Sequence, residues 1–163
     1  MKKLMCLVLT LLLVFSSFPF AKASADEFKN EPEIICYEDG SYTIITMEEQ
    51  LAPVDGCTAG LKAITSTKNA SKTYTHYDSS GSVVWAVTLS ASFTFDGTTS
   101  TCTAASCSIS IYNSAWYTVS SSTSRSGNTA TANVTMGRKV LGVTVQTIPI
   151  TITLSCDANG NLS

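Results

Sequence analysis

Residues 83–95 read VVWAVTLSASFTF, and this stretch decides the fold. Apolar side chains occupy every second position from Val83 to Phe95, and small or hydroxylated residues fill most of the places between them. A period of two puts the apolar set on one face of a β-strand, whereas a helix would scatter it around the axis. The stretch therefore predicts a long strand with one buried face. Trp85, which buries the most area, is expected at the centre of the core.

Shorter segments of the same kind lie on both sides of this central strand. The turn at residues 78–81 precedes it, and Asp96-Gly97 closes a hairpin after it. Strands are expected at residues 72–77, 107–111, 116–119, 130–136 and 148–156. Strand and turn signals about every 8–12 residues predict an all-β protein, an immunoglobulin-like antiparallel β-sandwich, with a small β-barrel as the alternative.

Two details refine this picture of the later strands. Residues 120–126 contain only Ser, Thr and Arg, and we interpret them as a polar run that ends in a turn at Gly127-Asn128. Pro149 has no N–H to donate, so its part of the last strand is expected at a sheet edge or a bulge. Another turn is expected near Leu141-Gly142.

An acidic segment precedes the sandwich. Residues 26–55 hold nine Asp or Glu against one Lys, and a solvated segment is the favoured interpretation over a cation site or a site for a basic partner. Residues 34–37 and 42–47 predict a short N-terminal hairpin. An isolated hairpin is marginal in water, so this one must dock onto the rest or stay mobile. We therefore expect an acidic segment with hairpin and linker at 26–58 and a sandwich domain at 59–163.

The first 25 residues have the three parts of a secretory signal peptide. Two lysines follow Met1, residues 5–20 are mostly apolar, and residues 21–25 supply small side chains for cleavage. We expect cleavage after Ala25, with Ala23 as the alternative. The apolar stretch is shorter than the roughly 20 residues that a spanning helix needs, so a retained anchor is the weaker interpretation. The mature protein is expected to be secreted, with no membrane insertion after signal removal.

No catalytic motif stands out in the mature sequence. His76 is the single histidine, so a Ser-His-Asp or Cys-His mechanism would need it, but no GxSxG elbow is present. We expect His76 to be a surface or half-buried strand residue. Asp78, Asp96 and Asp157 fall in turns, where an Asp usually bonds the local backbone. The later basic residues are dispersed, which argues against nucleic acid as a partner.

Two further patterns are compatible with a binding function, but a structural role is the favoured interpretation of both. Asp157, Asn159 and Asn161 have the spacing of a calcium loop, but the Glu that an EF-hand needs at its twelfth position is missing. We expect no metal and no cofactor. Five aromatic residues are candidates for an exposed face that binds sugar or peptide, although core positions or cross-strand pairs are favoured: Tyr74, Tyr77, Tyr112, Trp116 and Tyr117.

Cysteine usage agrees with export. Removal of the signal leaves Cys36, Cys57, Cys102, Cys107 and Cys156. The number is odd, so at least one thiol is free or pairs between chains, and two bridges among five cysteines have about fifteen arrangements. The sequence has no CxxC, and one His cannot complete a Cys/His zinc set, so we interpret these residues as structural thiols.

Several segments of the chain resemble a group of small uncharacterised secreted proteins from Gram-positive gut bacteria. The matching segments cover most of the mature chain: residues 37–42, 73–97, 100–103, 113–116, 126–130 and 153–163. The resemblance implies no activity, but it implies a Cys102–Cys156 disulfide, which would stabilise the fold by roughly 3–4 kcal/mol. Cys36 with Cys57 is the second candidate pair, and Cys107 would then be a buried free thiol.

Three functions remain after these observations. We favour a secreted, non-enzymatic interaction module whose ligand, a protein or a glycan, the sequence does not identify. The alternative is a structural or colonisation protein at the cell surface, and a hydrolase that uses His76 is the weakest of the three.

Overall fold

A computed structural model describes residues 32–51 and 65–163, with only the backbone of Leu51. The expected signal peptide, Cys57 and most of the expected linker lie outside the described residues. The described chain forms eight strands: β1 (Glu33–Cys36), β2 (Tyr42–Leu51), β3 (Ser66–Tyr77), β4 (Val83–Phe95), β5 (Ser100–Ile111), β6 (Trp116–Ser126), β7 (Thr129–Val140) and β8 (Val143–Ser155).

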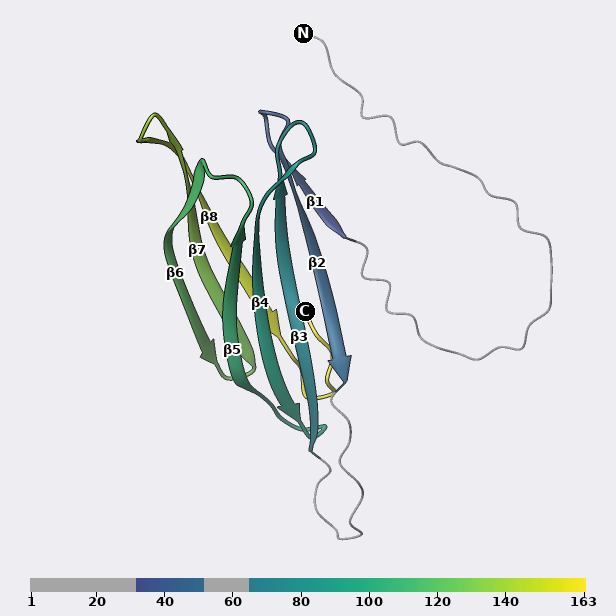
Figure 1. Cartoon of the computed structure of the whole chain (residues 1–163). Coiled ribbons are helices and arrows are strands. Elements are labelled where there is room, and N and C mark those ends of the chain that lie inside the picture. Colours follow the sequence, from purple (N-terminus) through teal and green to yellow (C-terminus); the bar gives the residue numbers. More distant parts are fainter. Residues whose placement is uncertain (1–31, 52–64) are drawn as a thin grey trace, which may run out of the picture.

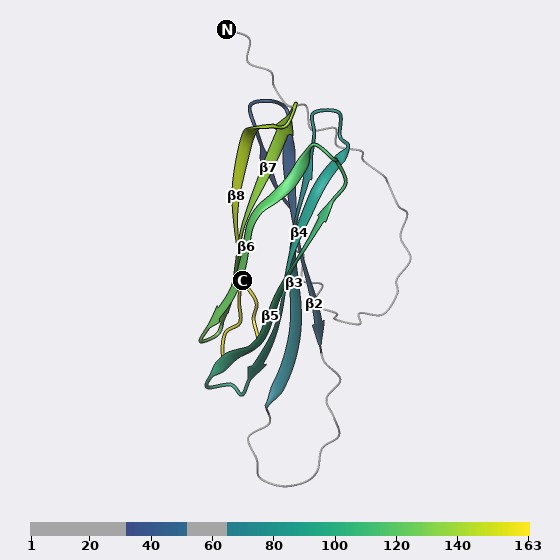
Figure 2. The same ribbon diagram turned by 60° about the vertical axis from the view of Figure 1, so that its left-hand side comes forward.

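These strands make a two-layer antiparallel sandwich, as the sequence predicts. The larger sheet has the order β1-β2-β3-β4-β5 and the smaller sheet the order β6-β7-β8. The two sheets face each other in both views (Figures 1 and 2). Over the described residues they do not close into the alternative β-barrel, because the chain crosses from one layer to the other between β5 and β6 instead of pairing those strands.

The connections follow the simplest possible path. Every strand within a sheet pairs with its neighbour in sequence. In an immunoglobulin domain, Greek-key connections carry the chain back and forth between the two sheets. The likeness to that fold therefore lies in the two packed antiparallel layers, and the path of the chain is that of a meander.

The core lies between β4 and the smaller sheet. Trp85, Leu89 and Phe93 alternate along β4 and are all buried, as their period of two predicts. Ala132, Val134 and Met136 of β7 and Ile152 and Leu154 of β8 are buried with them in one cluster. β8 pairs only with β7, so Pro149 lies on an edge strand, as predicted.

The N-terminal hairpin is part of the larger sheet. β2 pairs with β3 along its full length, from Tyr42 opposite Tyr77 to Leu51 opposite Lys68. Thr43 and Ile45 are buried on the inner face of this extension. The hairpin thus docks, and the sheet begins within the acidic segment rather than at residue 59.

The strand predicted at residues 116–119 is too short, because the polar run at residues 120–126 belongs to the same strand. These residues continue β6 and pair with β7 as far as Ser126 opposite Thr129. Most of their side chains are exposed because β6 is an edge strand. Ser and Thr tolerate an extended backbone with a wet side chain, so the strand forms here without the apolar alternation that marks a buried face.

Candidate functional site

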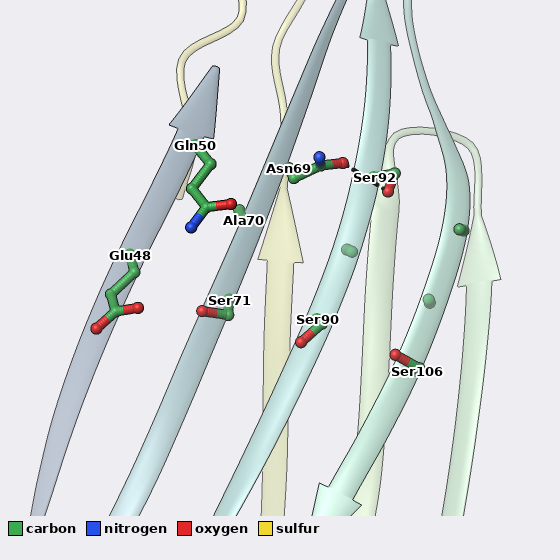
Figure 3. Close-up of a pocket in the computed structure, with 11 residues that line it drawn as sticks. Glu48, Gln50, Asn69, Ala70, Ser71, Ser90, Ser92 and Ser106 are labelled. Atoms are coloured by element: carbon green, nitrogen blue, oxygen red, sulfur yellow. Dashed lines mark hydrogen bonds between the residues drawn. The ribbon is translucent and has the colours of Figure 1, made fainter. Parts of the chain in front are cut away.

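The outer face of the larger sheet carries two rows of side chains that cross four strands, and all but one of them are polar. Glu48 of β2, Ser71 of β3, Ser90 of β4 and Ser106 of β5 form the first row. The second row runs parallel to it, in the order Gln50, Asn69, Ser92 and Ala104. Figure 3 shows the longer side chains on β2 and β3 and the short serines on β4 and β5.

A depression of about 420 Å³ lies over these rows. It is hollow because the residues at its centre are Ser and Ala, whose side chains rise little above the backbone, while Glu48, Gln50 and Asn69 stand at one side (Figure 3). A register shift in the β4–β5 pairing falls between Ser92 and Phe93, next to the second row. β-Bulges of this kind bend a strand locally and occur often beside functional sites.

The depression has hydrogen-bonding groups that the protein does not use itself. Ser92 Oγ donates to Asn69 Oδ1 at 2.8 Å. Five other lining side chains make no hydrogen bond within the part of the chain that the structure describes: Glu48, Gln50, Ser71, Ser90 and Ser106. A carboxylate accepts, a carboxamide does both, and each hydroxyl donates and accepts. The site can therefore bind a ligand that offers both donors and acceptors.

His76 lies elsewhere, and the expectation that it is at the surface or half-buried is wrong. Its side chain is only 3% exposed. It points to the inner face of β3, opposite Thr43 of β2 and Trp85 of β4. The ring stacks on Trp85 with the centroids 4.7 Å apart, and Tyr37 and Trp116 present ring edges to it. Docking of the hairpin thus encloses a histidine that a lone strand would leave accessible.

A second pocket of about 260 Å³ adjoins His76, between the ends of the two sheets. Asp39 and Asp78 line it from the larger sheet, and Arg138 and Gln146 line it from the smaller sheet. The Asp78 carboxylate accepts from the Ser80 hydroxyl and from two backbone N–H groups, and these bonds lower the pKa of Asp78. Bonds from Ser41 lower the pKa of Asp39 in the same way.

The contacts of His76 beside this pocket are those of a packed side chain. His76 Nδ1 lies 3.1 Å from the Oγ1 atom of Thr43, which is 1% exposed and out of reach of a substrate. Burial lowers the pKa of His76, and the charges of Asp39 and Asp78 only partly oppose that effect. The bond between His76 and the buried Thr43 joins β2 to β3 and so helps to hold the hairpin against the sheet.

The remaining turn carboxylates behave as the sequence predicts. Asp96 accepts from the backbone N–H groups of Thr98 and Thr99. Asp157 accepts from those of Asn159 and Asn161, so the calcium-like spacing forms a turn. Within residues 32–51 and 65–163, no group of three or more His, Cys, Asp or Glu is placed to hold a metal ion.

The five aromatic candidates do not gather on one face. Tyr74 packs against the core, and Trp116 is buried. Tyr77 stacks on Tyr42, which lies directly opposite it on β2, with the centroids 4.8 Å apart. Tyr117 bonds to Thr144, and only Tyr112 is strongly exposed. Core positions and cross-strand pairs account for most of this set.

The thiols of Cys102 and Cys156 are both free and buried. The two residues flank one turn: the N–H of Cys102 donates to the carbonyl of Gly127 at 2.8 Å, and the N–H of Cys156 donates to that of Asn128 at 3.1 Å. This proximity agrees with the proposed bridge, which stays a prediction. Cys36 is exposed on β1, and Cys107 is a half-buried free thiol.

Sequence reasoning missed the depression, although it identified the outward positions of β4. The missing information is the register, which decides that Ser90 lies between Ser71 and Ser106.

Comparison with protein-family models, curated proteins and solved structures finds no match for this chain. No helix in the described residues is long and apolar enough to span a membrane.

Proposed function

We propose that this protein is a secreted, non-enzymatic binding module that holds a glycan in the depression on its larger sheet. The observation that carries the proposal is the pair of polar rows, whose side chains surround about 420 Å³ and are mostly unpaired within the described chain. That volume falls in the usual range for a small-ligand site, roughly 300–1,000 Å³.

The chemistry of the lining favours a neutral, hydroxyl-rich ligand. Each sugar hydroxyl both donates and accepts, which matches the serines and Gln50, while Glu48 accepts two donors. The lining contains one carboxylate and no Lys or Arg, so it has no charge to attract a phosphate. It also contains no aromatic ring for stacking. Hydrogen bonds must then supply the affinity, and we expect the depression to bind a glycan with modest affinity.

A glycan array with the immobilised chain from Asp26 onward tests the proposal, followed by titration calorimetry on any glycan that binds. Ser90→Val places branched carbons in the centre of the depression on a strand that tolerates them. Ser122→Val makes the same change on exposed β6 of the other sheet. We expect Ser90→Val to abolish binding and Ser122→Val to keep it. Absence of any glycan ligand, or equal binding by both variants, refutes the proposal.

Secretion is a separate part of this proposal. It rests on the charged, apolar and small-residue parts of residues 1–25. N-terminal sequencing of the protein recovered from culture medium should begin at Asp26. Recovery of the chain in the membrane fraction with Met1 intact contradicts export and leaves the glycan site to be judged on its own binding data.

A further inference from the structure

The hairpin between β7 and β8 ends in an exposed apolar tip. Leu141 is 100% exposed, Val143 is 66% exposed and Val145 is 56% exposed, and Val140 is nearly half exposed. We call Val140, Leu141, Val143 and Val145 the apolar tip. Both views show this hairpin projecting at the end of the sandwich where the β1–β2 and β3–β4 turns also lie (Figures 1 and 2).

The fold itself gives no reason for leucine at this position. Val140 pairs with Val143, so Leu141 and Gly142 form a two-residue turn, with φ values of 50° and 83°. Turns with two positive φ angles favour Asn-Gly, and a leucine in the left-handed region is strained. Leu141 thus adopts an unfavourable backbone conformation and buries none of its side chain.

Basic side chains stand directly behind the apolar tip. Arg138 and Lys139 are both exposed, and neither forms a salt bridge within the described residues. Lys139 Nζ lies 4.2 Å from the centre of the Tyr117 ring. Tyr112, 65% exposed, belongs to the connection between β5 and β6, and this connection lies at the same end of the sandwich (Figure 1). Arg138 also lines a pocket with Asp39 and Asp78, two carboxylates in turns of the other sheet that accept hydrogen bonds from neighbouring residues.

We infer that the apolar tip docks the protein on an anionic lipid surface. A convex tip of one leucine and three valines can enter the boundary between headgroups and acyl chains, where burial of apolar area favours it. Arg138 and Lys139 then lie at the level of the anionic headgroups, which attract juxtamembrane basic residues. A tyrosine is suited to the same level, because its ring is apolar and its hydroxyl is wet. Such docking needs no spanning segment.

Co-sedimentation with vesicles tests this inference on the chain from Asp26 onward. The vesicles contain either phosphatidylcholine alone or phosphatidylcholine and phosphatidylglycerol in equal parts, and neither carries a glycan. We expect binding to the anionic vesicles and much weaker binding to the neutral ones. Leu141→Asn removes the apolar side chain, and asparagine accepts the left-handed conformation. This variant should bind at least about tenfold more weakly, while its melting temperature stays the same or rises.

Ile34→Thr is the matched control. It removes an exposed apolar side chain from β1, the edge strand of the other sheet, and should leave vesicle binding unchanged. Lack of wild-type binding to anionic vesicles overturns the inference, and so does equal binding by wild type and Leu141→Asn. Concentration-dependent self-association that Leu141→Asn abolishes, without vesicle binding, would assign the tip to a second copy of the chain. None of these outcomes depends on the glycan site.

Discussion

A disulfide between Cys102 and Cys156 should add about 4 kcal/mol to the free energy of unfolding. Cys102 lies on β5 of the larger sheet and Cys156 just after β8 of the smaller one, and both donate backbone N–H groups to the Gly127-Asn128 turn. The bond would therefore join the two sheets through buried atoms. It would close a loop of about 55 residues, and loop closure of that length lowers the entropy of the unfolded chain by about 4 kcal/mol at 25 °C.

Urea unfolding of the oxidised protein, with and without a reductant, measures this contribution. With a slope of about 2 kcal/mol per molar urea, reduction should lower the midpoint by about 2 M. Peptide mapping without reduction should show Cys102 joined to Cys156. In Cys156→Ala, reductant should no longer cause this fall in the urea midpoint, because the bond between the sheets cannot form. In Cys107→Ala the fall should remain. A Cys102–Cys107 link, or a wild-type midpoint that reductant does not move, refutes the reasoning.

Two other predictions concern stability. Gly160→Ala should lower the free energy of unfolding by about 3 kcal/mol, because Gly160 has a φ of +87° and a Cβ there would lie 2.5 Å from the Phe95 ring. Gly97→Ala is the control: its φ is +83°, no atom lies within 4 Å of the added Cβ, and the loss should be about 1 kcal/mol. Equal urea midpoints for the two variants would contradict this prediction. Burial lowers the pKa of His76 from 6.5, so the unfolded chain takes up the proton first and stability should fall as pH drops from about 7 to 5. In His76→Phe the urea midpoint should stay nearly constant between about pH 7 and 5. The turn carboxylates do not affect this range, because they lose their stabilising effect only as pH falls through and below 3.8. An unchanged pH slope in that variant would show that another group titrates.

The sequence predicts a strand most reliably where one face is buried and the other is wet. β4 has this property from Trp85 to Phe93, and its first residues depart from the alternation, because Val84 is buried and Val83 is exposed. β6 lacks it, because Ser and Thr occupy both faces of an exposed edge strand and leave no period to detect. Propensity alone cannot separate such a strand from a polar loop.

The candidate sites were harder to predict, because they depend on which strands become neighbours. His76 is buried only because β2 covers one side of it and Trp85 the other. The depression exists only in the register that aligns Glu48, Ser71 and Ser90. The turn carboxylates needed no such information, since Asp96 and Asp157 bond to backbone atoms within a few residues of themselves. A single sequence therefore predicts hydrogen bonds between residues close in the chain, but it does not predict the register of strands.

The meander also decides the order in which this chain can fold. Each strand of a sheet needs only the strand before it, so a chain that emerges N-terminus first can add one hairpin at a time to structure already present. A Greek-key sandwich has to wait for distant partners before its central strands are satisfied. Here only the closure of the two layers awaits the last residues, when the turn that follows Cys156 reaches the β4–β5 turn, where Gly97 N–H donates to the carbonyl of Ala158. If the chain is exported, as we propose, it can fold by this path as it leaves the export pore.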